Sequence, residues 1–378
     1  MNRPALSHAP GPVLEGVALK ATLLKRLDAA VGPLLTRLLP KMGLPDSLPS
    51  PLRFLVIRPG GIGDAVLLIP ALRALQEAFP GCSIDLLAES RNAAAFQMCP
   101  GLNRVLRYDS LPQVATVLRT PYDVVIDSEQ WYRLSAVLAR LVRSRRSIGF
   151  CTNDRGRLFT DPVPYTLDDY ELLSFFRLLA PLGVQPPRDT SAPFLKLPAG
   201  AKEGARRLLA PLEGKFFVAV FPGASIPEKQ WGEDNFRQVA EGLVAAGIAV
   251  VVVGGDDARA VGERLARGGV ALNLAGKGGL MESAAVLAEA GVLLSGDSGL
   301  LHIAAGLGTA TVSLFGPSDA EKWAPKGERH IKFTSSLSCA PCSRYGTIRC
   351  SDGACCLDAV PSEVTAAMLR LCEKDRRP

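Results

Sequence analysis

Three short segments of the chain place glycines next to carboxylate, hydroxyl or imidazole side chains, a combination that suits a phosphorylated ligand. They are 59–64 (PGGIGD), 254–257 (GGDD) and 295–302 (SGDSGLLH). Each follows a short apolar run rich in β-branched residues, which is typical of a buried strand. Glycines after a strand let the backbone turn tightly and approach a ligand closely. The glycines of these turns are Gly60, Gly61, Gly63, Gly254, Gly255 and Gly296.

Asp64 ends the first turn and is a candidate general base, because a carboxylate at the mouth of a cleft can accept a proton from a hydroxyl. The alternative is a helix N-cap, a role that Asp fills routinely. The turn does not match the dinucleotide fingerprint G-x-G-x-x-G, and Glu89 lies late after the next predicted strand for contacting a ribose. An NAD site is therefore disfavoured.

The second half of the chain supplies groups that a nucleotide-sugar donor needs. Asp256 and Asp257 could accept hydrogen bonds from ribose hydroxyls, although turn and cap chemistry explains them equally well. Lys229 offers a cation to a departing diphosphate, with an ordinary surface charge as the alternative. Because no Asp-x-Asp triplet occurs, the usual acidic clamp for a metal-bound nucleotide sugar is missing. The leaving-group charge must then be met by Lys229, helix N–H groups and His302.

The segment 295–302 opens a predicted helix whose first N–H groups can face a phosphate. Gly296 and Gly299 permit close approach, and Ser298 and His302 share a face if both are helical. The letters GDSG also surround the nucleophile of trypsin-like proteases. However, none of the three histidines suits a triad base, and an alternating α/β pattern is the wrong host for that motif.

Five of the nine cysteines crowd one late stretch, which in a large cytosolic enzyme favours reduced thiols or a metal site over disulfides. These cysteines are Cys339, Cys342, Cys350, Cys355 and Cys356. A structural zinc bound by Cys339, Cys342, Cys350 and Cys356 is the less favoured alternative to unligated cysteines. We predict no catalytic metal.

The elements that must position these groups alternate between apolar strands and helices, and this alternation runs twice. The predicted buried strands are 54–58, 84–88, 124–126, 217–221, 249–253, 292–295 and 310–315. Strands that lack polar alternation predict parallel sheets covered on both faces, so the fold class is α/β with two Rossmann-like, doubly wound domains facing a central cleft. A proline-rich stretch separates the two runs. The predicted organisation is an N-terminal extension at 1–52, a first domain at 53–185, a linker at 186–198, and a second domain at 199–378 with a cysteine-rich segment at 339–356 and a terminal helix.

The N-terminal extension holds much of the chain's excess positive charge, and its leucines and valines recur at helical spacing between lysines and arginines. One interpretation is a basic amphipathic helix on an anionic membrane surface; the other is a helix packed on the protein's own core. No apolar run approaches the roughly 18 residues of a spanning helix, and no signal-peptide pattern is present. We therefore expect a cytoplasmic protein, with peripheral contact at the inner face of the cytoplasmic membrane as the open question.

Taken together, these motifs resemble glycosyltransferase family nine, the ADP-heptose:lipopolysaccharide heptosyltransferases, over about residues 53–370. The most specific match runs from Gly296 to Ala305 and on through Leu314–Pro317. Other segments that carry the resemblance are Gly61–Asp64, Pro70–Leu72, Tyr122–Asp127, Arg145–Phe150, Phe221–Ala224, Lys229–Trp231, Gly254–Gly255 and Ala275–Lys277. The chain departs from the family in its longer start and in its Arg58–Gly61 turn.

The resemblance implies the GT-B fold and inverting transfer without a metal or cofactor. It implies that Asp64 is the base, that Lys229 contacts the donor phosphates, and that a loop of the second domain holds the phosphates and sugar. That loop comprises Asp297, Ser298, Gly299 and His302. Asp256 or Asp257 would meet the ribose, and the choice between them stays open.

The function that follows is transfer of a heptose or related sugar, with ADP-heptose as the expected donor. The expected acceptor is a lipid-linked saccharide, either the lipopolysaccharide core or a similar cell-envelope glycan. The alternatives are a transferase that uses a UDP- or GDP-linked sugar, or a non-catalytic nucleotide-binding protein. Aromatic residues make up only 6% of the chain, and no nucleic-acid partner is expected.

Overall fold

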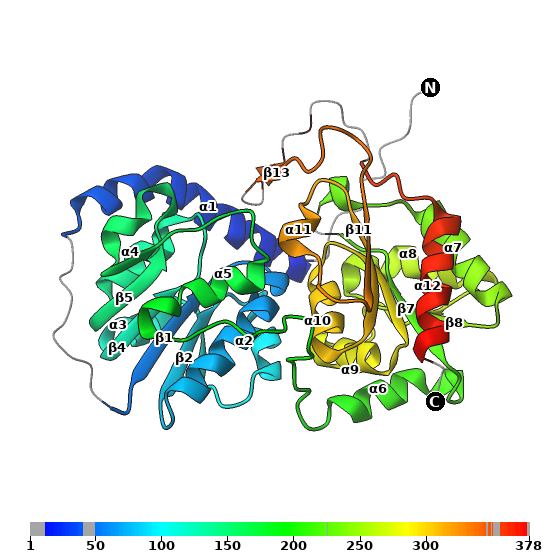
Figure 1. The fold of residues 1–378 in the computed structure, drawn as a ribbon, viewed down its shortest axis with the longest axis horizontal. Coiled ribbons are helices and arrows are strands. Elements are labelled where there is room, and N and C mark those ends of the chain that lie inside the picture. The colour runs from blue at the N-terminus through cyan, green and yellow to red at the C-terminus, as the bar shows by residue number, and fades with distance from the viewer. Residues whose placement is uncertain are drawn as a thin grey trace.

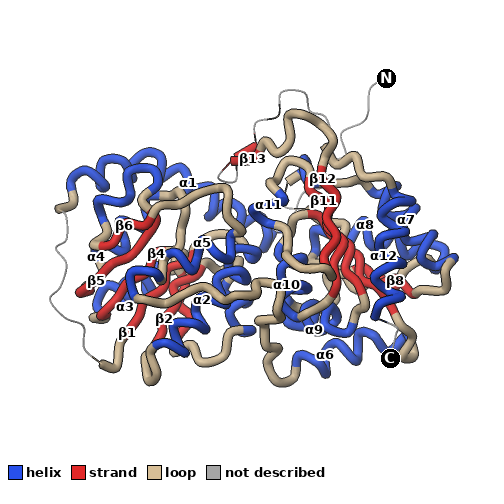
Figure 2. The backbone as a smooth tube through the Cα atoms, viewed as in Figure 1, coloured by secondary structure: helices blue, strands red, loops and turns tan. Residues whose placement is uncertain are grey.

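The computed structural model describes residues 12–40, 50–224, 226–344, 347–348, 350 and 356–375. Two six-stranded sheets dominate it, each wholly parallel and each covered by helices on both sides (Figures 1 and 2). The predicted fold class, two doubly wound α/β units, is confirmed. Both sheets are built from short runs of buried β-branched and leucine side chains, which is the composition expected of strands covered on both faces.

The first sheet has the strand order β3-β2-β1-β4-β5-β6. Its strands are β1 (Arg53–Arg58), β2 (Ser83–Ala88), β3 (Arg104–Arg107), β4 (Tyr122–Asp127), β5 (Ser144–Phe150) and β6 (Asp161–Val163). The chain leaves β1 in one direction and returns at β4 in the other, so the strand order reverses between these two neighbours. In open α/β sheets, ligands bind outside the carboxyl ends of the strands at such a reversal.

The second sheet repeats this topology, because its order β9-β8-β7-β10-β11-β12 reverses between β7 and β10. Its strands are β7 (Phe217–Phe221), β8 (Ala249–Val252), β9 (Leu272–Asn273), β10 (Val292–Gly296), β11 (Ala310–Phe315) and β12 (His330–Thr334). A small antiparallel pair, β13 (Ser343–Arg344) and β14 (Thr347–Ile348), follows it. Each sheet therefore offers one reversal point for a ligand.

Helices of ordinary length connect these strands. Around the first sheet lie α2 (Ile62–Ala78), α3 (Leu111–Arg119), α4 (Arg133–Leu141) and α5 (Glu171–Arg177). Around the second lie α6 (Ala201–Leu209), α7 (Glu233–Ala245), α8 (Asp256–Ala266), α9 (Leu280–Glu289), α10 (Gly299–Leu307), α11 (Ala320–Trp323) and α12 (Pro361–Asp375). Short 3₁₀ turns occur at Ala93–Met98, Thr152–Leu158, Ala180–Leu182, Ala210–Leu212, Pro227–Lys229 and Arg267–Gly269.

The N-terminal helix α1 (Pro12–Leu38) lies along the outside of the first domain and packs on α4 (Figure 1). On its inner face, the carboxylate of Asp28 accepts a hydrogen bond of 2.6 Å from the backbone N–H of Leu134. The outer face exposes Leu23, Leu27, Val31, Leu34 and Leu38. The packing interpretation therefore holds for one face of α1, and the other face leaves an apolar stripe uncovered. In the described part of the chain, no helix is long and apolar enough to span a membrane.

Candidate active site between the two domains

The two domains meet where the first turns of α2 and α10 pack against each other, in the middle of the molecule (Figure 1). Glycines make this approach possible. A Cβ atom on Gly63 would lie 2.9 Å from Cδ2 of His302, and one on Gly299 would lie 2.8 Å from Cβ of Ile62. Any side chain at either glycine would push the helices apart, because real Cβ atoms do not approach this closely. The α2–α10 contact therefore brings the carboxyl ends of β1 and β10 together.

Asp64 lies in the first turn of α2, three residues after Gly61, and Gly61 rather than Asp64 is the N-cap residue of this helix. Its Oδ1 instead accepts a hydrogen bond of 3.2 Å from Nε2 of Gln130, which follows β4. The capping alternative is therefore not what the structure shows. The carboxylate is partly exposed at the carboxyl end of the first sheet, where an acceptor hydroxyl could reach it.

The buried guanidinium of Arg58 lies beneath the glycine turn. Its Nε donates to the carbonyl of Pro59 at 2.7 Å, its Nη1 donates to the carbonyl of Ser128 at 2.7 Å, and Nη2 lies 3.0 Å from where a Cβ of Gly60 would be. Burial alone would lower the pKa of Arg58, but the carboxylates of Asp64 and its neighbours outweigh this and raise it. The guanidinium therefore stays charged and fixes the turn that carries Asp64.

Lys229 and Asp297 face each other in the second domain, with Nζ 2.5 Å from Oδ2. Burial would raise the pKa of Asp297, but Lys229 and His302 outweigh it and lower the pKa. Asp297 is therefore a carboxylate that holds the Lys229 ammonium in place. Since the Lys229 ammonium has no other side-chain partner among the described residues, it can also pair with an incoming diphosphate.

His302 is almost fully buried at the domain junction, and its Nε2 lies 4.0 Å from Oδ1 of Asp297. Burial lowers the pKa of His302, although Asp297 and Asp64 oppose this. Its buried Nδ1 has no hydrogen-bond partner in the described part of the chain. A buried polar atom left without a partner costs stability, so its retention here is consistent with a ligand contact.

Ser298 is the N-cap of α10, where its Oγ accepts a hydrogen bond from the N–H of Leu301. It therefore lies outside the helix and does not share a helical face with His302, contrary to the conditional expectation from their spacing. The Oγ also lies 2.8 Å from Oγ of Ser295. Ser298 thus shapes the helix start, while the free N–H groups of the first turn remain available to a phosphate.

The two aspartates after β8 point to different neighbours. Asp256 forms an ion pair with Arg259, whose Nη2 also donates to the carbonyl of Gly276 at 3.2 Å. Oδ2 of Asp257 instead lies close to the loop after β7, only 2.9 Å from where a Cβ of Gly223 would be. The structure therefore places Asp257, but not Asp256, towards the neighbouring strand end.

The predicted glycine turn at Gly254 has a backbone φ of +138°, and a Cβ there would lie 2.7 Å from Cβ of Ala258. A cavity of about 470 Å³ opens beside the helix that follows, α8. Arg259, Glu263, Asn273 and Lys277 are among its lining residues. This cavity therefore lies on the second domain, and neither Gly254 nor Gly255 is among the residues that line it.

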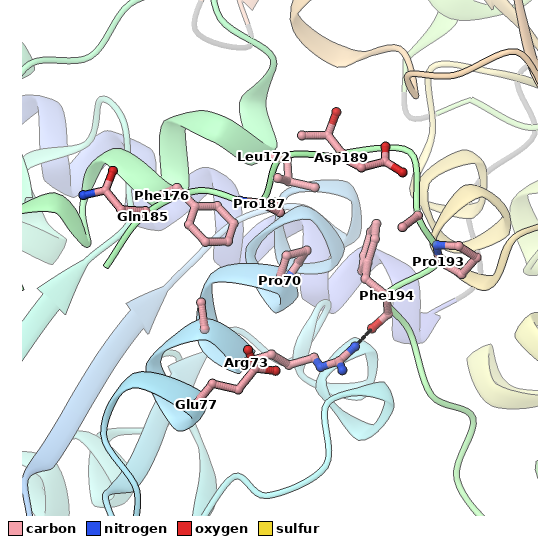
Figure 3. A pocket seen from close by; sticks show the side chains of 13 residues that line it. Pro70, Arg73, Glu77, Leu172, Phe176, Gln185, Pro187, Asp189, Pro193 and Phe194 are labelled. Carbon is pink, nitrogen blue, oxygen red and sulfur yellow. Dashed lines mark hydrogen bonds between the residues drawn. The ribbon is translucent and has the colours of Figure 1, made fainter. Parts of the chain in front are cut away.

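A second cavity, of about 250 Å³, lies under the segment that joins the domains (Figure 3). It is bounded by the later turns of α2, by α5 and by residues 185–194, and Nη1 of Arg73 donates to the carbonyl of Phe194 across it at 2.9 Å. Asp64 does not line this cavity. We therefore assign it to the joint between the domains and not to the chemistry.

The cysteine segment is described only in part, and Cys355 lies outside the described residues. Cys356 is buried, with its Sγ only 2.7 Å from where a Cβ of Gly316 would be, while Cys339 and Cys350 are exposed. Within the described ranges, no three His, Cys, Asp or Glu side chains are arranged to hold a metal ion. The packing of Cys356 is that of a small apolar side chain.

Comparison with known proteins identifies the family. The model of glycosyltransferase family 9 (heptosyltransferase) matches residues 113–350. The chain belongs to this family. It is 29% identical over 295 residues to lipopolysaccharide heptosyltransferase 3 of Escherichia coli, covering 72% of this chain and 85% of that protein. It is 24% identical over 309 residues to lipooligosaccharide heptosyltransferase 2 of Haemophilus ducreyi, covering 74% and 88%.

Solved structures agree on the fold of this family 9 glycosyltransferase. E. coli ADP-heptose lps heptosyltransferase II matches with a TM-score of 0.72 at 20% identity, over 86% of this chain and all of that chain. E. coli heptosyltransferase WaaC with ADP-2-deoxy-2-fluoro heptose matches at 0.60 and 22% identity, over 75% and 93%. The dodecameric, iron-containing E. coli heptosyltransferase TibC in complex with ADP-D-beta-D-heptose matches at 0.54 and 15%, over 88% and 78%.

Proposed function

We propose that this enzyme transfers a heptose from ADP-heptose to a lipopolysaccharide core or similar cell-envelope glycan, with inversion and without a metal. The observation that carries the proposal is the position of Asp64, which lies at the domain junction facing the loop of Asp297 and His302. The relatives named as heptosyltransferases support heptose as the transferred sugar. Two related structures that contain ADP-linked heptoses support ADP as the nucleotide of the donor.

In the proposed reaction, the Asp64 carboxylate accepts the proton of the acceptor hydroxyl. The hydroxyl oxygen forms a bond to the anomeric carbon while the bond from that carbon to the diphosphate oxygen breaks on the opposite face. This geometry inverts the anomeric centre. ADP leaves with the bonding electron pair, and its developing charge is met by the Lys229 ammonium and the N–H groups at the start of α10.

Each group is suited to one part of this reaction. The ion pair with Asp297 orients Lys229 before the donor arrives, so the cation needs no large movement. His302, held neutral by burial, can donate or accept a hydrogen bond without adding charge beside Asp64. Asp257 is our choice for the ribose, since its carboxylate faces the loop after β7.

The test is thermal stabilisation of the purified protein by ADP, UDP, GDP and NAD, each with and without EDTA. A ligand that binds only the folded state raises the melting temperature, by an amount that grows with its affinity. We expect ADP to stabilise most and EDTA to change nothing. A preference for UDP or GDP would replace the donor, and a response lost with EDTA would overturn metal independence, which matters because one structural relative contains iron.

We also propose that the outer face of α1 rests on an anionic membrane surface. Five apolar side chains, Leu23, Leu27, Val31, Leu34 and Leu38, are between 38% and 69% exposed and recur every three or four residues, so they form one stripe. The exposed Arg26 and Arg37 stand three helical turns apart along one border of that stripe. An apolar stripe beside basic side chains fits the boundary between acyl chains and anionic headgroups.

Flotation with vesicles of phosphatidylethanolamine and phosphatidylglycerol tests this surface. We expect the protein to float, and the variant L27S/L34S to stay in solution. Leu111→Ser, at an exposed leucine on α3, is the matched control and should still float. If the wild-type protein ignores the vesicles but forms a dimer that L27S/L34S abolishes, the stripe is a contact between two copies and the membrane proposal is wrong.

A further inference from the structure

Three buried polar side chains outside the predicted site connect Asp64 to the opposite domain. They are Gln130 after β4, Glu171 at the start of α5, and Lys322 on α11 of the donor domain. Gln130 is 9% exposed, Glu171 is not exposed and Lys322 is 1% exposed. Polar groups buried this deeply are costly unless each is matched by partners. The hydrogen-bond and ion-pair partners of these side chains therefore indicate their role.

The amide of Gln130 is oriented by charges on both of its ends. Its Nε2 donates to Oε1 of Glu171 at 2.7 Å and to Oδ1 of Asp64 at 3.2 Å. Its Oε1 accepts a hydrogen bond from Nη2 of Arg58 at 3.3 Å. Reversing the amide would turn its oxygen towards two carboxylates and its NH₂ group towards a guanidinium. Only one orientation of Gln130 is therefore compatible with its neighbours, and that one holds Asp64.

Glu171 is held equally firmly. Its Oε2 accepts from the hydroxyl of Tyr165 at 2.9 Å and lies 2.7 Å from Nζ of Lys322, while Oε1 is left to Gln130. Burial and the charge of Asp64 raise the pKa of Glu171, and Lys322 opposes this. The ion pair with Lys322 therefore opposes the loss of the Glu171 charge, while Oε1 of Glu171 accepts from Gln130.

Lys322 reaches this cluster from the other domain. Its ammonium donates to the carbonyl of Thr166 and to Oγ of Ser174, each at 2.8 Å, and pairs with Glu171. These three acceptors match the three N–H bonds of an ammonium group. All of them belong to the first domain, so the lysine completes its shell only when the two domains are together.

We propose that Glu171 is a positioning residue for the transfer reaction: it fixes the Gln130 amide, which holds Oδ1 of Asp64, and Lys322 of the donor domain keeps Glu171 in place. This inference rests on the proposed role of Asp64 as base. The arrangement leaves Oδ2 of Asp64 without a hydrogen bond from any residue within the described ranges, and Oδ2 is thus the oxygen that faces the acceptor hydroxyl. Proper alignment of the acceptor-side base then depends on contact with the donor domain.

Stability alone does not account for this cluster. A buried ion pair contributes little net stability compared with well-packed apolar side chains of similar volume. Such a replacement would leave the domain contact intact but would remove the acceptor that orients Gln130. Misplacing a reacting group by about 1 Å can cost about a hundredfold in rate. The positioning role therefore predicts an effect on turnover that a packing role does not.

Two double variants separate these roles, because both remove the ion pair. E171L/K322M leaves no acceptor for Gln130, whereas E171Q/K322M retains a side-chain oxygen in the same place. We expect E171L/K322M to lower kcat about tenfold to a hundredfold, with the KM for donor unchanged within about twofold. E171Q/K322M should recover most of the lost kcat. R146M/D161N, which removes an ion pair between β5 and β6, is the control and should keep wild-type kcat.

Equal kcat values in the two double variants would overturn the proposal, whether both are normal or both reduced. If E171L/K322M does not fold, Gln130→Leu removes the amide directly and is expected to give the same loss of kcat at unchanged donor KM. Wild-type kcat in that variant would also overturn the proposal. Failure of the underlying function is distinguishable, since it would appear as retained transfer in Asp64→Asn.

Discussion

The two sheets share one strand order, yet their reversal points carry different kinds of chemistry. At the first, between β1 and β4, hydrogen bonds from buried side chains fix the geometry: Arg58 supports the glycine turn and Gln130 holds Asp64. At the second, between β7 and β10, backbone is exposed by glycines and a helix start, and Lys229 has Asp297 as its ion-pair partner.

The difference follows from what each side must do in the proposed reaction. A base must present one oxygen in a fixed direction, so it is held by a network of side chains whose members satisfy one another. A donor site must accept a diphosphate and release it in every turnover. Backbone N–H groups and one shared cation can exchange partners without rebuilding a network. Substitutions on each side test this contrast between a fixed side and an exchanging side.

The largest effect is expected on the fixed side, from Asp64→Asn. An amide keeps the shape of the side chain but cannot accept the acceptor's proton. We expect kcat to fall about a thousandfold, within the range that general bases contribute. The affinity for ADP, measured by calorimetry, should stay within about threefold because the donor is held by the other domain. Retained turnover would show that Asp64 is not the base.

On the exchanging side, Lys229→Met should weaken donor binding and turnover together. A hydrogen bond to a charged group contributes about 1.5–3 kcal/mol, so we expect ADP affinity to fall about 10- to 100-fold. Measuring this affinity at several salt concentrations gives a second readout, since loss of a charge contact should reduce the salt dependence. An unchanged affinity for ADP would remove Lys229 from the phosphate site.

A smaller effect concerns two histidines, one at the domain junction and one at the edge of the second sheet. Burial lowers the pKa of His330 to about 4 and also lowers that of His302. In the unfolded chain both titrate near about 6.5. The unfolded state therefore binds protons first as the pH falls, and the free energy of unfolding should decrease from about pH 6.5 towards about pH 4.

Denaturant unfolding at pH 7 and pH 5 measures this decrease. His330→Gln should make the decrease in unfolding free energy smaller by about 1–2 kcal/mol, because one pKa unit corresponds to about 1.4 kcal/mol. The same variant should leave turnover at pH 7.5 unchanged. His302→Gln should also reduce the decrease in unfolding free energy between pH 7 and pH 5, and it should lower turnover as well. A full pH dependence in His330→Gln would show that the acid sensitivity comes from other groups.

Most of the fold could be predicted from sequence, because buried parallel strands have a distinct composition. The runs that became β1, β7, β8, β10 and β11 are nearly all apolar, and each was predicted with only small errors at its ends. Five strands of the two parallel sheets were missed: β3, β5, β6, β9 and β12. Of these, β3 is a half-exposed RVLR segment, and β5 begins with charged residues that pair with a neighbouring strand, as Arg146 does with Asp161.

The site was predictable only where it follows a local pattern. Glycine turns after strands pointed to Asp64 and to the loop of Asp297, and the structure places both at the α2–α10 junction. Gln130, Glu171 and Lys322 left no such signal, because single polar residues usually lie on the surface. Gln130 does follow the predicted strand β4 at its carboxyl end, which is where a ligand site in an open sheet is expected. Contacts between distant segments could only come from the structure.

The glycine contact between α2 and α10 also has an electrostatic consequence. It brings together the N-termini of two helices, each of which carries a partial positive charge from its aligned peptide dipoles. Two such ends close to one another create a region that favours anions, including the diphosphate after the sugar has left. We therefore expect ADP to remain bound after transfer and to compete with the donor. The same close packing that assembles the site would then make release of its product a slow step.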